Sequence, residues 1–249
     1  MNPPTEDLRH IRAEARADLV RRLLAVAISV GVAATLAKMS WVQNGRLPDP
    51  AELNQTIALG TALAATILSW DGPLLAMPQR PLFGFGRFLV DVALVFVYMF
   101  LLMGALHPGC MLWTLAVIFL VYVLRDVLTI REHAEGYDRA LAGARRASPT
   151  QIWHVYTGGF ANRSEVEPRP VVTLIWAIYF LLLAFIASPH ADAHVRTSCV
   201  FALIGVVGYW LDEAGQQRSE SDGGMRWRSI IVLSALIAAA IYFRLLPGR

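Results

Sequence analysis

The sequence has few charged residues. Only 16% of its 249 residues are Asp, Glu, Lys or Arg, whereas 56% are hydrophobic. Soluble domains usually carry about 25% charged residues. The mean hydropathy of +0.48 and the lack of long polar stretches therefore argue against a soluble domain and predict a membrane protein.

Lysine occurs once, as Lys38, beside 21 arginines. A retinal-binding seven-helix protein needs a lysine deep in its last span, so that class is excluded. A voltage sensor needs an arginine-rich span, and no apolar run here is one. Because the basic residues gather beside apolar runs, the pI of about 9.1 reflects membrane orientation, and no nucleic-acid partner is expected. The abundance of arginine and alanine is typical of a GC-rich bacterial genome, which predicts the bacterial inner membrane.

Cysteine occurs twice, as Cys110 and Cys199, at a spacing that fits no zinc or redox motif. The two are interpreted as small apolar residues at membrane boundaries, with one disulfide as the alternative. Walker, nucleophile-elbow and HExxH patterns are absent. We therefore expect no cofactor, and an enzyme is the weakest of the functional hypotheses. The two halves show no inverted repeat of the kind found in secondary transporters.

The apolar residues form runs that can cross a hydrocarbon core of about 30 Å as helices. We predict an all-α fold, a polytopic transmembrane helix bundle of about seven spans in one domain, 23–249. The expected spans are 23–39, 53–70, 88–106, 111–130, 171–188, 197–211 and 229–246. The sixth is the shortest, and the second is expected to stop at Asp71-Gly72-Pro73.

The flanking segments carry most of the charge. Residues 1–22 are interpreted as a cytoplasmic basic amphipathic segment, of which 7–22 form a helix on the membrane surface that leads into the first span. Residues 131–170 are interpreted as a cytoplasmic loop whose first part, 131–147, continues as a charged helix. The side that holds the N-terminus carries 16 Lys and Arg and the other side five, which predicts a cytoplasmic N-terminus.

Small residues recur at close spacing on three spans, which lets helices approach one another or a second copy of the chain. The pairs are Ala27 with Gly31, Gly60 with Ala64, and Gly205 with Gly208; Ser29, Ala33 and Ala37 form a second stripe on the first span.

The third and fourth spans form a hairpin around the short turn 107–110, and this hairpin holds the embedded charges Asp91, Arg125 and Asp126. Asp91 and Asp126 are equally far from the turn, so an antiparallel hairpin places them level. Polar residues also recur at helical spacing in both spans, so that they form one polar stripe along each helix. The stripes are Arg87, Asp91 and Tyr98 on one helix and Tyr122, Arg125 and Thr129 on the other. Together with Asp126, these residues are predicted to form a polar seam.

Two interpretations of the polar seam stay open. It binds or conducts a small cation or a proton, as in a channel or transporter for a small ion. Alternatively it is an ion pair that fixes helix register in a non-catalytic membrane anchoring, sensing or assembly module, which acts through its basic cytoplasmic helix. Both interpretations have the lipid bilayer as a partner.

A second cluster, His190, Asp192 and His194, lies in the loop before the sixth span. Imidazole and carboxylate groups suit zinc or another divalent metal, and His107 or Cys110 would supply a further ligand. The alternative is an ordinary solvated loop, because alternate residues converge on one ion only in extended backbone.

Overall fold

The structure is a computed structural model that describes residues 4–76, 84–132, 148–151, 153, 169–216 and 224–245. Within these ranges the chain folds into helices and turns, with no strand, as the all-α prediction requires. The long helices are α1 (Pro4–Leu36), α3 (Pro50–Ala76), α4 (Phe85–Met103), α5 (Pro108–Glu132), α7 (Arg169–Ala187), α8 (Val195–Gln216) and α9 (Gly224–Leu245). The short elements are α2 (Ser40–Gln43) and the 3-10 turns η1 (Gly104–Leu106) and η4 (Ser188–His190).

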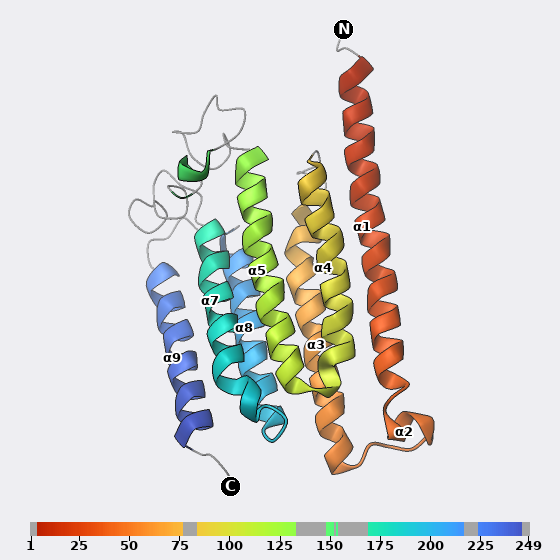
Figure 1. Ribbon diagram of the computed structural model, residues 1–249, viewed down its shortest axis with the longest axis vertical. Coiled ribbons are helices and arrows are strands. Elements are labelled where there is room, and N and C mark those ends of the chain that lie inside the picture. The colour runs from red at the N-terminus through yellow and green to blue at the C-terminus, as the bar shows by residue number, and fades with distance from the viewer. Residues whose placement is uncertain are drawn as a thin grey trace.

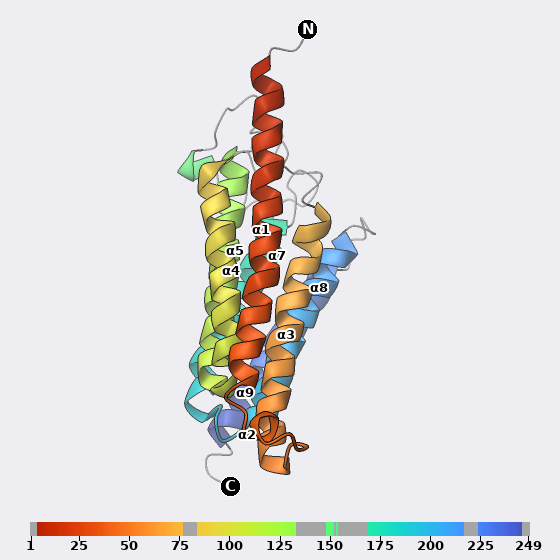
Figure 2. The same cartoon turned by 90° about the vertical axis from the view of Figure 1, so that its right-hand side faces the viewer.

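The long helices run roughly parallel to one axis in two layers (Figures 1 and 2). Helices α9, α7, α5, α4 and α1 follow one another in the first layer, and α3 and α8 pack together behind them. We call the end that holds the α4–α5 turn the turn end, and the opposite end, beyond which α1 projects, the N-terminal end. Helix α1 begins at the N-terminal end and α9 finishes at the turn end, so the two termini of the chain lie at opposite ends of the bundle (Figure 1).

Four helical stretches are long and apolar enough to cross a membrane: Ile11–Leu36, Phe85–Leu106, Pro108–Arg131 and Val172–His190. The apolar parts of α8 and α9, Val195–Leu211 and Ile231–Phe243, are shorter. Besides its apolar core, the bundle exposes large apolar side chains on its outside, among them Val26, Phe96, Phe100, Val117 and Phe185. Such an exterior is poorly suited to water and well suited to lipid. The structure therefore supports a membrane protein.

Helix α1 is a single continuous helix of 33 residues. The sequence predicts a surface helix over 7–22 that leads into a separate span, but the helix continues without a break through that boundary. The helix packs on α4, its side chains are buried at intervals from Ala13 onward, and Arg16 lies over the rings of Phe85 and Phe88 at 5.9 and 5.8 Å. The cation–π contact holds α1 beside the start of α4.

Helix α3 continues past the expected break at Asp71-Gly72-Pro73 and ends at Ala76, so that expectation is wrong. Proline removes one amide from a helix and disturbs the carbonyl four residues before it. The neighbouring helix α5 compensates for the missing amide, as described below. Residues 77–83, between α3 and α4, lie outside the described residues.

The hairpin of α4 and α5 forms as the sequence predicts. Helix α4 passes into η1, the amide of His107 donates to the carbonyl of Gly104 at 2.9 Å, and α5 begins at Pro108. Proline suits the first position of a helix, where its missing N–H has no partner to lose.

Two of the three small-residue pairs pack against other helices. A Cβ built on Gly31 would lie 2.9 Å from the Cβ of Leu102, and one on Gly208 would lie 2.3 Å from the Trp176 ring. Gly60, by contrast, faces open space on the outside of α3. The close approach of α1 to α4 and of α8 to α7 thus depends on glycine.

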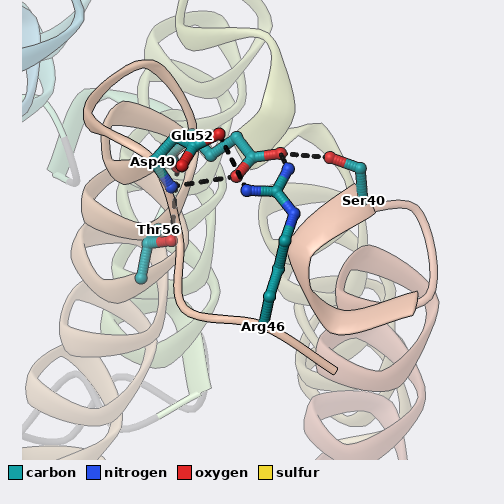
Figure 3. Close-up of polar contacts among 5 residues, drawn as sticks. All are labelled: Ser40, Arg46, Asp49, Glu52 and Thr56. Atoms are coloured by element: carbon teal, nitrogen blue, oxygen red, sulfur yellow. Dashed lines mark hydrogen bonds and ion pairs between the residues drawn. The ribbon is translucent and has the colours of Figure 1, made fainter. Parts of the chain in front are cut away.

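A polar clamp fixes the connection between α1 and α3 at the turn end (Figure 3). The carboxylate of Glu52 accepts hydrogen bonds from the hydroxyl of Ser40, from Arg46 at 2.8 Å and from the amide of Asp49 at 3.0 Å. Arg46 also contacts Asp49 at 2.7 Å. A glutamate in the first turn that binds the amide preceding the helix is half of a capping box, so the clamp fixes the start of α3.

Candidate functional site

The polar seam lies between α4 and α5 in the N-terminal half of the bundle. The carboxylate oxygen Oδ1 of Asp91 is 2.8 Å from Nε of Arg125, and the two side chains are only 1% and 9% exposed. The hairpin register places the two charges level, and helix periodicity turns both toward the interior. The structure therefore brings together the two embedded charges as an ion pair between neighbouring helices.

The remaining charges of the polar seam balance this pair. Arg87 lies one turn before Asp91 on α4 and is buried, whereas Asp126 on α5 is half-buried. Two positive and two negative groups thus lie near one another on α4 and α5 in the N-terminal half of the bundle. Because an isolated charge in a membrane interior costs several kcal/mol, this balance lowers the cost of burying all four.

A chain of hydrogen bonds links the seam to α3. The hydroxyls of Tyr98 and Tyr122 are 2.6 Å apart, and the hydroxyl of Tyr122 donates to the backbone carbonyl of Ser69 at 2.9 Å. A carbonyl only accepts, so the single hydroxyl hydrogen of Tyr122 goes to Ser69 and Tyr98 donates to Tyr122. Ser69 lies four residues before Pro73, and its carbonyl therefore lacks the helical amide that would otherwise bind it.

Aromatic rings close the seam on the side of the turn end. Trp70 packs edge-on against Tyr98 with ring centroids 6.0 Å apart. Phe119 and Tyr209 pack on Tyr122 at 5.7 and 6.1 Å. Aromatic pairs in these geometries pack densely and add specific attraction to their burial.

Beyond the rings, the interface between α4 and α5 becomes apolar up to the turn. The buried side chains of α4, η1 and α5 on that side are Leu101, Leu102, Ala105, Met111, Leu112 and Leu115, each at most 1% exposed. Polar side chains of the seam thus occupy only the N-terminal half of this interface. Chemically, the arrangement can hold an ion pair and orient hydroxyl groups, but its polar groups stop at the aromatic layer.

The structure does not assemble the metal site considered for His190, Asp192 and His194. Among the described residues, no group of three or more His, Cys, Asp or Glu side chains lies close enough to hold a metal ion. His194 instead packs edge-on against Tyr242, and its Nδ1 lies 3.3 Å from the Tyr242 hydroxyl. The physical reason is that the segment before α8 turns, with no extended backbone to aim alternate side chains at one point. Cys110 is exposed, Cys199 is buried, and both are free thiols, so the alternative of a disulfide is not realised.

Sequence reasoning missed two partners of the seam, the carbonyl of Ser69 and the ring of Tyr209. Pro73 was a usable signal, because a proline in a helix always leaves a carbonyl four residues earlier without its amide. No signal in the sequence pointed to Tyr209, since it comes from α8, which is distant in the chain. The sequence further predicts that Asp71, Asp212 and Glu213 end near the seam, but their side chains lie outside the described ones.

Comparison with known proteins gives no relative: no family model matches the chain, and no curated protein and no solved structure matches it. The functional argument therefore depends on the geometry of the site.

Proposed function

We propose that the protein is an integral membrane protein of the bacterial inner membrane that crosses the bilayer seven times, with its N-terminus in the cytoplasm. We further propose that it acts as a non-catalytic anchoring, sensing or assembly module. The observation that carries this function is the closed, charge-balanced ion pair of Asp91 and Arg125, which is sealed by aromatic rings and followed by an apolar layer.

Helix lengths and charge distribution support the topology. Helices α3, α8 and α9 have 27, 22 and 22 residues, which correspond to about 40, 33 and 33 Å at 1.5 Å per residue. Each is long enough to accompany the four longer apolar stretches across a core of about 30 Å. The excess of 16 Lys and Arg over five on the opposite side supports the orientation.

The local environment of Asp91 supports a structural role for the seam. A conducting path needs polar groups or water through the whole apolar thickness. Along the interface between α4 and α5, the polar groups end at the aromatic layer of Trp70, Phe119 and Tyr209. The buried polar side chains nearer the turn end, among them Thr66 and Ser198, belong to α3 and α8. An ion pair at one level, with complementary charges on two helices, is instead what fixes the register of an antiparallel hairpin.

The projecting part of α1 supports an anchoring or assembly role. This helix is packed on α4 along the bundle and continues beyond it at the N-terminal end (Figure 2). In the proposed orientation it carries basic residues into the cytoplasm. A rigid basic helix beside the inner leaflet suits contact with anionic lipid or with an acidic partner.

A second candidate is a channel or transporter for a small cation or a proton around Asp91. The observation that favours it is the carboxylate itself, which is 0% exposed within an apolar bundle. Ionisable groups at such positions in membrane proteins often mark ion pathways.

Ion flux into liposomes separates the two candidates. Purified protein is reconstituted and tested with K⁺, Na⁺ and H⁺ gradients under applied voltage, beside Asp91→Asn and a matched Asp126→Asn variant. An anchoring module gives flux equal to that of empty liposomes in every case, and Asp91→Asn loses thermal stability. Flux through the wild type that disappears in Asp91→Asn, while Asp126→Asn still conducts, refutes the proposal and assigns an ion pathway to the seam.

A further inference from the structure

A pocket of about 360 Å³ opens at the turn end of the bundle, away from the polar seam. Three segments that are distant in the sequence line it: the first turns of α3, the α4–α5 turn, and the loop before α8. Its lining residues are Asn54, Gln55, Ala58, Ala105, Leu106, His107, Pro108, Asp192 and Val195. Its volume falls at the small end of the range for small-molecule sites.

Tertiary contacts hold the walls of this pocket in place. Nε of Arg196 in α8 donates to Oδ1 of Asn54 in α3 at 2.9 Å, which joins two of the walls directly. The third wall, η1 with its following turn, packs on both α3 and α5. A pocket with fixed walls spends little free energy on ordering when a ligand enters.

The lining combines apolar surface with a single formal charge. Ala58, Ala105, Leu106, Pro108 and Val195 form the apolar part. Among the described lining residues Asp192 is the only acidic one and none is Lys or Arg; the other polar side chains are the amides of Asn54 and Gln55 and the imidazole of His107. The nearby guanidinium of Arg196 is engaged with Asn54.

We propose that this pocket binds a small organic ammonium compound with a short apolar body. The ammonium group pairs with the carboxylate of Asp192 and donates to the amide oxygen of Gln55, and the carbon chain lies on Leu106 and Val195. Asp192 also lies three residues before α8, where a carboxylate favours the start of a helix. The ligand therefore adds a partner to a carboxylate that already has a local structural role. This inference is independent of the proposed anchoring function, because binding is measured without a membrane partner.

Binding is tested with n-propylamine and n-butylamine as probes, and with n-butanol and butyrate as neutral and anionic analogues. Calorimetric titration uses the full chain purified in detergent. Two variants change the pocket in different ways: Asp192→Asn removes the charge and keeps the shape, and Gln55→Trp fills an exposed part of the lining. Asp18→Asn is the matched control, because it removes the same charge from an exposed side chain on α1.

We expect saturable binding of at least one ammonium probe, with neither analogue bound. Binding should weaken at least tenfold in Asp192→Asn and in Gln55→Trp and stay unchanged in Asp18→Asn. Folding of each variant is checked by circular dichroism, and the two pocket variants test the same claim separately should one of them unfold. Absence of ammonium binding to folded wild type overturns the proposal and leaves Asp192 as a helix-start carboxylate only. Binding that survives both pocket substitutions also overturns it, since the probe then lies elsewhere.

Discussion

The hydroxyl of Tyr122 binds the backbone carbonyl of Ser69, at 2.9 Å, in the place where helix α3 lacks an amide. Position 73 is proline, so no N–H reaches that carbonyl from within α3. A side chain from α5 thus satisfies a backbone group of α3, which lets a proline-containing helix continue to Ala76 inside an apolar bundle.

Replacement Tyr122→Phe should destabilise the protein by about 1–3 kcal/mol, because it leaves the buried Ser69 carbonyl without a donor. In a Pro73→Ala background the residue at 73 supplies an amide, so the same replacement should cost markedly less. The measurement is the thermal unfolding midpoint of the four proteins of this double-mutant cycle in detergent. Tyr98→Phe is the control, because it keeps the Ser69 bond, and its cost should be the same in both backgrounds. An equal cost of Tyr122→Phe with and without Pro73 would contradict the assignment.

The buried ion pair predicts strong coupling between Asp91 and Arg125. Asp91→Asn alone should cost about 3–5 kcal/mol, because Arg125 is then a buried charge without its counter-ion. Adding Arg125→Gln should recover most of this loss, since two neutral polar groups replace two charges. Unfolding of single and double variants measures the coupling energy. Additive costs would show that the two residues act separately. Asp126→Asn should lower the stability less than Asp91→Asn, because Asp126 is only half-buried.

Replacement of two glycines by alanine should change the stability of the protein in opposite directions. A Cβ at Gly208 would lie 2.3 Å from the Trp176 ring, so Gly208→Ala should cost about 1–3 kcal/mol through overpacking of α8 on α7. Gly60 has no neighbouring atom within 4 Å, and Gly60→Ala should be neutral or stabilise by about 0.5–1 kcal/mol through helix propensity. Unfolding midpoints of the two variants test the packing. A loss at position 60 equal to that at 208 would indicate that α3 meets a further surface, such as a second copy of the chain.

The polar clamp at the start of α3 should make stability depend on pH. The hydroxyl of Ser40, the amide of Asp49 and then the charge of Arg46 hold the pKa of Glu52 below its ordinary value of 4.5. A carboxyl whose pKa is lower in the folded than in the unfolded protein stabilises the fold above the unfolded value, and this stabilisation is lost as the pH falls through the folded value. The difference in unfolding midpoint between wild type and Glu52→Gln should therefore be full at pH 7 and shrink as the pH falls below 4.5. A difference that stays constant down to pH 3 would exclude this linkage.

The two cysteines allow a test of orientation without engineering new ones. Cys110 is exposed at the turn end, whereas Cys199 is buried. With the proposed cytoplasmic N-terminus, a membrane-impermeant maleimide should label Cys110 from outside in intact cells, and Cys110→Ala should abolish the labelling. Labelling that requires permeabilised cells would reverse the orientation.

Much of the hairpin could be predicted from local pattern. Asp91 and Asp126 lie equally far from the midpoint of the turn 107–110, and Arg125 is one residue closer, so the level of the charges follows from the turn and helical periodicity decides the face. The charge-poor composition likewise predicts an all-α bundle with an apolar exterior. The metal site considered for His190, Asp192 and His194 could not be decided in this way. Their side chains reach one ion only in extended backbone, and residue spacing alone does not determine the backbone conformation of a loop.

The sequence by itself determined the apolar helices, the short turn between α4 and α5, and the level at which the charges lie, since each depends on local composition and helical geometry. Only the tertiary structure decided that α3 continues through Pro73, that Tyr209 covers Tyr122, and that Asn54, His107 and Asp192 line one pocket. These features depend on contacts between helices far apart in the chain. Their free energy appears only when a neighbouring helix supplies a donor, a ring or a wall at the required place.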